Sequence, residues 1–169
     1  MRGAVALFVT LYLLHGMVAE VNSALSGVHV WLFAGGLFVA YSALMVPFRQ
    51  GFVVTALAGL LCDSVTPVPF GTHAGLFAVA HGFVFNARER LQRDETAVRV
   101  VVALIVNAAL FLALTFVRIR VAHGGAGAWP RILSDLVCSE AAVAAIAPWF
   151  FALQVRTLEL ARAQPSRAA

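Results

Sequence analysis

The stretch TAVRVVVALIVNAALFLALTFVR, residues 96–118, is apolar over a length that decides the fold class. A membrane core about 30 Å thick is crossed by about 20 mainly apolar residues in a helix. The whole chain has the same character, because 62% of its residues are hydrophobic, 12% are charged and its mean hydropathy is +0.90. Soluble domains carry about 25% charged residues. The sequence therefore predicts an all-α integral membrane protein, folded as a compact helical bundle in contact with membrane lipids.

Apolar segments recur along the chain, and we expect about six transmembrane helices in a single transmembrane domain, residues 1–169. The first segment resembles a signal peptide, but its apolar run is long and others follow it, so we interpret it as a retained helix. The third helix is expected to be short, because about 16 residues at 1.5 Å each span only about 24 Å. The tail, about 160–169, is expected to be disordered. The expected helices are 3–20, 28–47, 51–66, 71–87, 96–118 and 132–155.

The arginines predict how these helices are oriented. All twelve basic residues are arginine, and they lie between or beside the apolar segments, where orientation signals are found. With six crossings, nine of them fall on the side of the N-terminus and three, Arg118, Arg120 and Arg131, on the other. This bias predicts that both termini are cytoplasmic. It also explains the excess of basic over acidic residues, so nucleic-acid binding is not needed to account for it. The nine are Arg2, Arg49, Arg88, Arg90, Arg93, Arg99, Arg156, Arg162 and Arg167.

A carboxylate beside an apolar run distinguishes the stretch GLLCDSVTPVPFG, residues 59–71. An ionised group in a membrane is costly unless it is partnered, hydrated or near an interface, so Asp63 requires an explanation. One reading is a structural anchor that accepts backbone N–H bonds in the following turn. The other is contact with a ligand or partner. Pro67 and Pro69 should stiffen the turn, and Gly71 should free the backbone to re-enter the bilayer.

The expected fourth helix carries two further candidate features. His73 and His81 lie eight residues apart, near one face of a helix. His81 is expected to hydrogen-bond a neighbouring helix, and a proton relay with Asp63 is the alternative. The small residues Ala74, Ala78 and Gly82 recur every four positions and predict a ridge that lets another helix approach closely.

The expected sixth helix carries two carboxylates in its first turns. Asp135 suits the positive end of the helix dipole. Glu140 lies deeper and should face the bundle, toward Arg118 or Arg120. Five residues apart, the two should not form a close pair.

No recognisable catalytic pattern is present in the sequence. It contains no HExxH, no GxSxG and no Cys–His pair in a known context. Cys62 and Cys138 lack metal-ligand spacing. We therefore expect a protein that is not an enzyme and that uses no cofactor or metal.

A family resemblance begins at Pro47 and runs through the stretch 59–71. A proline near the end of one helix is followed by a short apolar helix that closes as GLLCD, then by a loop that ends PFG. With Gly59, Asp63, Phe70 and Gly71 in these places, the chain resembles the rod shape-determining protein MreD family. Arg49 and Pro69 lie within the same candidate motif, which covers about a fifth of the chain.

The resemblance implies a non-enzymatic inner-membrane component of the machinery that elongates rod-shaped cells and builds peptidoglycan. It implies membrane lipids and an MreC-like protein as partners, and through MreC an actin-like filament and a glycosyltransferase–transpeptidase pair. It supplies no catalytic residue. The alternative is the substrate-binding subunit of an energy-coupling-factor transporter, another six-helix bundle. Residues 3–20 lack the Ala-x-x-x-Ala ridge by which such subunits often dock their coupling module.

Overall fold

The fold is all-helical in the computed structural model, which describes residues 2–28, 30–91, 95–122 and 129–163. Within these ranges it contains six α-helices and two short 3-10 turns, with no strand. The turns are η1 (Ser26–Val28) and η2 (Arg88–Arg90). The α-helices are α1 (Arg2–Leu25), α2 (Gly35–Met45), α3 (Phe48–Val65), α4 (Thr72–Ala87), α5 (Thr96–Ala122) and α6 (Trp129–Ala163).

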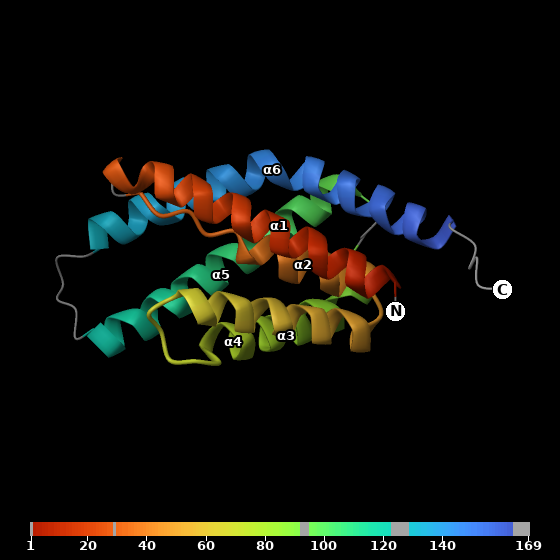
Figure 1. Cartoon of the computed structure of the whole chain (residues 1–169), viewed down its shortest axis with the longest axis horizontal. Coiled ribbons are helices and arrows are strands. Elements are labelled where there is room, and N and C mark those ends of the chain that lie inside the picture. Colours follow the sequence, from red (N-terminus) through yellow and green to blue (C-terminus); the bar gives the residue numbers. More distant parts are fainter. Residues whose placement is uncertain (1, 29, 92–94, 123–128, 164–169) are drawn as a thin grey trace.

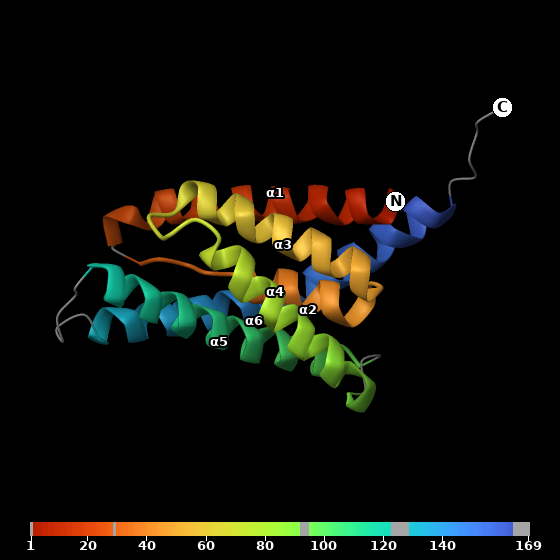
Figure 2. The same cartoon turned by 90° about the horizontal axis from the view of Figure 1, so that it is seen from below.

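The helices run lengthwise beside one another and alternate in direction (Figures 1 and 2). The N-terminus, the α2–α3 turn, the end of α4 and the C-terminal end of α6 lie at one end of the bundle. We call this the N-terminal end. The α3–α4 loop and the C-terminal part of α5 lie at the opposite end, which we call the loop end.

Four of the described helices, α1, α3, α5 and α6, are long and apolar enough to cross a membrane. Their outward faces are apolar as well, since Tyr12, Leu13 and Met17 of α1 are exposed, as is Trp149 of α6. A soluble protein rarely leaves so much apolar surface uncovered. The structure is therefore compatible with a multi-pass membrane protein.

The shortest α-helix is α2, whereas the third helix was expected to be the short one. α3 has 18 residues and is one of the four possible spans, whereas α2 has only 11, or about 16 Å of helix. Residues 30–34 are non-helical, although residues 28–47 were predicted to be one continuous helix. The reason is tertiary: side chains from other helices hydrogen-bond the backbone of this segment, as described below.

The remaining boundaries differ from the expected ones mainly by extension. α1 continues to Leu25, α5 to Ala122, and α6 begins at Trp129. α6 also includes residues 160–163, which were expected to be disordered, while residues 164–169 lie outside the described part of the chain. Hydropathy windows end where polar residues begin, but a helix can continue into water beyond the apolar segment.

The centre of the bundle is α2, whose residues from Gly35 to Leu44 are all buried. It packs against α3, α4, α5 and α6. The ring of Tyr41 packs against both Phe150 and Phe151 of α6, with its centroid 5.9 and 5.8 Å from theirs. Burial on all sides explains why α2 is apolar around its whole circumference.

Candidate functional site

Asp63 lies at the end of α3 and joins it to the start of α4. Its side chain is 5% exposed and accepts four hydrogen bonds. Oδ1 accepts from His73 N at 2.9 Å and from His73 Nδ1 at 2.8 Å. Oδ2 accepts from Gly71 N at 3.0 Å and from Ala74 N at 3.2 Å. Three of these bonds come from backbone N–H groups, as the structural-anchor reading of Asp63 expects.

Three of the bonds to Asp63 satisfy backbone N–H groups at the α4 N-terminus. The first N–H groups of a helix have no acceptor within it, and the N-terminus carries partial positive charge. The residue before α4, Gly71, has φ 93° and offers no side-chain cap. Asp63 therefore caps α4 from another helix, and its negative charge is placed where the helix dipole favours it.

His73 contributes more to this junction than its position in the sequence suggested. The imidazole is buried, and its Nδ1 meets the carboxylate. Because an ionised carboxylate can only accept, the 2.8 Å contact places a proton on Nδ1. His81, eight residues later, lies about 12 Å further along α4, so the predicted relay through both histidines and Asp63 is not assembled.

Gly59 brings the two helices of the junction together. It lies one helical turn before Asp63, and a Cβ added to it would lie 2.5 Å from Ala74 Cα and 2.6 Å from Ala74 N. Any side chain would push α4 away and lengthen the bonds to Asp63. Gly59, Asp63, Gly71, His73 and Ala74 thus form one unit, which we call the α3–α4 junction.

The predicted ridge of small residues makes a close contact with another helix at only one end. Ala74 meets Gly59, but a Cβ added to Gly82 would have no heavy atom within 4 Å. Ala78 is half-buried. The second close approach involves His81 instead, because a Cβ on Gly51 of α3 would lie 2.6 Å from His81 Nε2 and 2.8 Å from Ser42 O.

His81 is fully buried in an aromatic setting near the N-terminal end. The rings of Phe48, Phe52 and Phe85 surround it, with centroids 5.5–6.1 Å away. Arg88 lies over the ring of Phe85, with its guanidinium carbon 3.6 Å from the ring centroid. The hydrogen bond predicted from His81 to a neighbouring helix is not formed, because neither ring nitrogen has a partner in hydrogen-bonding geometry among the described residues, and the side chain instead packs between α3 and α4.

The remaining motif residues lie on the surface of the α3–α4 hairpin. Pro47 and Arg49 are exposed at its start, and the carbonyl of Pro47 accepts from Gly51 N at 2.9 Å. At the other end the carbonyl of Pro69 accepts from Thr72 N and Oγ1. Phe70 is 75% exposed and points away from the bundle core.

A second polar cluster, which sequence reasoning missed, holds the non-helical residues 30–34. Asn22 of α1 bonds both backbone polar groups of one residue: its Oδ1 accepts from Leu32 N at 2.7 Å and its Nδ2 donates to Leu32 O at 2.9 Å. From α6, Asp135 Oδ1 accepts from Trp31 N and Ser139 Oγ accepts from Phe33 N. Irregular backbone at membrane depth requires such internal partners.

Asn107 of α5 is a further member of this cluster. Its Oδ1 accepts from Gly36 N at 3.0 Å and its Nδ2 donates to Phe33 O at 3.1 Å and to Glu140 Oε1 at 3.0 Å. Glu140 was expected to face Arg118 or Arg120, but it bonds Asn107. The signal that could have revealed the cluster was a lone buried asparagine in the apolar run 96–118.

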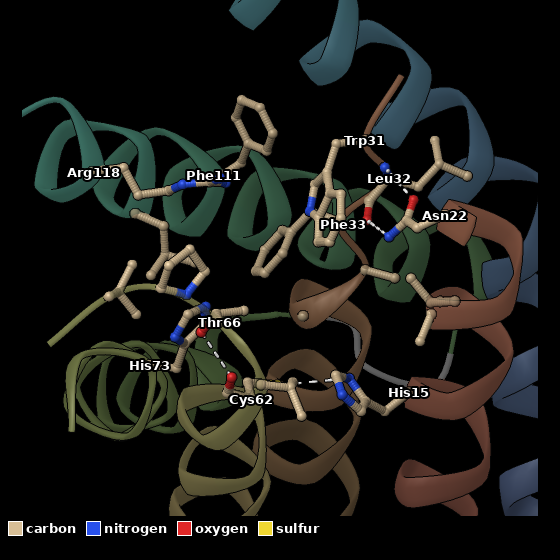
Figure 3. Close-up of a pocket in the computed structure, with 18 of the residues that line it drawn as sticks. His15, Asn22, Trp31, Leu32, Phe33, Cys62, Thr66, His73, Phe111 and Arg118 are labelled. Atoms are coloured by element: carbon tan, nitrogen blue, oxygen red, sulfur yellow. Dashed lines mark hydrogen bonds between the residues drawn. The ribbon is translucent and has the colours of Figure 1, made fainter. Parts of the chain in front are cut away.

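A cavity of about 530 Å³ lies between these two polar clusters at the loop end. Trp31, Phe33 and Phe111 lie across it from His15, Cys62 and His73, and Arg118 projects from α5 (Figure 3). Asn22 and the start of the α3–α4 loop also line it. The cavity is therefore bounded by both clusters.

Comparison with known proteins found no matching family profile, no matching curated protein and no matching solved structure. Among the described residues, no group of three His, Cys, Asp or Glu side chains is placed to hold a metal ion. The local geometry of the two clusters and the cavity is therefore the basis for the proposals below.

Proposed function

We propose that the chain is a non-enzymatic scaffold in the bacterial complex that elongates rod-shaped cells, with an MreC-like protein as its partner. The observation that carries the proposal is the α3–α4 junction. The residues that resemble the MreD family pattern, Gly59, Asp63 and Gly71, converge on one rigid unit. The pattern therefore includes both the close contact between α3 and α4 and the cap that fixes this contact. Such a pattern is more specific than a matching hydropathy profile.

The junction also presents an apolar side chain in a fixed position. Phe70, 75% exposed, lies between Pro69 and Gly71, and the N–H of Gly71 is held by Asp63. A partner that buries Phe70 would not have to order the turn first, so less binding energy would be lost to conformational entropy. Large aromatic side chains dominate many interfaces. We therefore place the main partner contact at this turn.

The orientation we propose has both termini in the cytoplasm and the loop end facing outward. Arg49, Arg88 and Arg90 lie at the N-terminal end of the bundle, whereas Arg118 and Arg131 lie near the loop end. This distribution satisfies the positive-inside rule for six crossings of an inner membrane. Two of the six crossings would be short. One is α4, and the other consists of residues 30–34 followed by α2.

Deletion of the gene in a rod-shaped host, followed by complementation, tests the proposed role. Deletion is expected to give round or swollen cells, and the wild-type gene to restore the rods. Unchanged cell shape after deletion would contradict the proposal. For the contact surface, Phe70→Ala should reduce recovery of the MreC-like partner in pull-down. Phe83→Ala is the matched control, since Phe83 is also 75% exposed but lies within α4.

The cavity favours a second candidate, the substrate-binding subunit of an energy-coupling-factor type transporter. A volume of about 530 Å³ lies within the range of small-molecule sites, about 300–1,000 Å³. Such a subunit should be stabilised by its substrate, because ligand binding to the folded state alone raises the unfolding temperature. Thermal unfolding of the purified protein with a panel of vitamins tests this candidate, and a rise with one member would support it.

A further inference from the structure

The cavity at the loop end has walls of two kinds. Trp31, Phe33 and Phe111 give it large apolar surfaces, and Leu114 of α5 also lines it. Its nitrogen-bearing side chains are His15, Asn22, Trp31, His73 and Arg118, and no Asp or Glu is among the described residues that line it. Such a site suits a molecule that is mostly apolar and that carries a group able to accept hydrogen bonds or neutralise a positive charge.

Arg118 supplies the only full positive charge in these walls among the described residues. No ion pair to Arg118 is found within the part of the chain that the structure describes. The neighbouring Arg120, by contrast, is placed over the ring of Phe116, 4.8 Å from its centroid. Guanidinium groups bind phosphate and carboxylate groups with paired hydrogen bonds, so the side chain of Arg118 is suited to an anion.

The positions along α5 give the occupant a direction. Arg118 is one turn from the end of α5 at Ala122, and Phe111 lies seven residues, or about 10 Å, deeper in the bundle. A ligand with its anionic group at Arg118 would therefore place its apolar part beside Phe111 and Phe33, away from water. This arrangement matches the orientation of a lipid in a bilayer, with the head group at the boundary.

The route into the cavity is also suited to a lipid. α1, which forms one wall, carries exposed apolar side chains at Met17 and Val21, close to the lining residues Val18 and Asn22. Val65 at the end of α3 lines the cavity and is itself exposed. A molecule already dissolved in the membrane could enter between these surfaces without crossing water.

From this geometry we infer that the cavity binds an anionic amphiphile, a molecule with an apolar chain and an anionic head group that contacts Arg118. The inference is independent of the proposed scaffold role, because it rests on the cavity and not on the α3–α4 hairpin surface. A free anion could satisfy Arg118 as well, but it would leave the aromatic walls in contact with water. The apolar walls therefore favour a lipid over a free phosphate.

Native mass spectrometry of the purified full chain in detergent, titrated with phosphatidylglycerol, tests the inference. Parallel titrations use phosphatidylcholine and inorganic phosphate. The wild type is expected to retain phosphatidylglycerol in preference to phosphatidylcholine. Arg118→Gln should weaken that retention about tenfold, as expected for loss of a charge-assisted contact, and Arg118→Lys should restore part of it.

Two matched variants separate the cavity from the general lipid shell. Arg120→Gln removes a positive charge two residues away outside the cavity and should leave retention unchanged. Ala19→Trp should reduce retention by filling the space, because Ala19 lines the cavity from α1. Equal retention by Arg118→Gln and Arg120→Gln would overturn the inference in favour of nonspecific surface lipid. Displacement of phosphatidylglycerol by inorganic phosphate would overturn it in favour of a free-anion site.

Discussion

The substitution Asp63→Asn tests the α3–α4 junction with almost no change in shape. The carboxylate accepts from three backbone N–H groups and from His73 Nδ1. An amide oxygen can replace only one carboxylate oxygen, and the amide NH₂ is itself a donor. If the oxygen faces His73, then Gly71 N and Ala74 N both lose their acceptor. If the amide is flipped, the N–H of His73 loses its acceptor while the ring can change tautomer and accept.

The flipped amide is the less costly arrangement and sets the lower limit of the effect. It loses one hydrogen bond to a charged group, worth about 1.5–3 kcal/mol, and the two that remain are weakened because the acceptor is neutral. We therefore expect Asp63→Asn to lower the free energy of unfolding by about 2–4 kcal/mol. Asp63→Ala, which removes every acceptor at once, should cost more than Asp63→Asn.

The measurement is an unfolding titration of the purified protein in mixed micelles with increasing sodium dodecyl sulfate, followed by tryptophan fluorescence. Ser64→Ala is the matched control, because Ser64 is exposed, adjacent to Asp63, and its hydroxyl donates to Leu61 O of its own helix. A change of at most about 0.5 kcal/mol is expected for it. If Asp63→Asn were no more destabilising than Ser64→Ala, the junction could not depend on the charge of Asp63.

Three further substitutions are expected to separate the contacts that hold the bundle, each measured by the same unfolding titration. Gly59→Ala should destabilise the protein by about 1–3 kcal/mol through a clash with the backbone of α4, whereas Gly82→Ala should be neutral or slightly stabilising in its helix, because open space surrounds it. Gly71→Ala should cost about 1–2 kcal/mol from its φ of 93° alone, since its surroundings are open. Asn107→Leu should cost about 2 kcal/mol or more by leaving buried backbone groups unpaired, and Asn86→Leu, at an exposed position of α4, should cost less than 0.5 kcal/mol.

The α3–α4 turn could be predicted from the sequence because its chemistry is local. Asp63, the prolines and Gly71 lie within nine residues, and each has a well-defined effect on a turn. The partner of Gly59 and the contact between His73 and Asp63 were not predictable in the same way. They depend on the angle at which α4 returns along α3, which no residue of the turn specifies alone.

The failure at residues 30–34 has a different cause. A hydropathy scale scores side chains and gives the same value to an apolar segment whether its backbone is helical or extended. The extended form is allowed here because acceptors and donors arrive from distant parts of the chain, including Asn107 and Ser139, 74 and 106 residues from Phe33. The information is in the sequence, but it lies in polar residues of three other helices.

Both polar clusters pair backbone groups that cannot reach water, but they do so in different ways. In the α3–α4 junction a single carboxylate bonds residues at the start of α4, and Gly59 leaves no space for movement. Residues 30–34 depend on separate side chains from α1, α5 and α6, so a shift of any one of these helices changes their contacts. The cavity touches the first cluster at His73 and the second at Trp31 and Asn22. A ligand bound there would therefore contact both the hairpin that carries Phe70 and the non-helical residues 30–34.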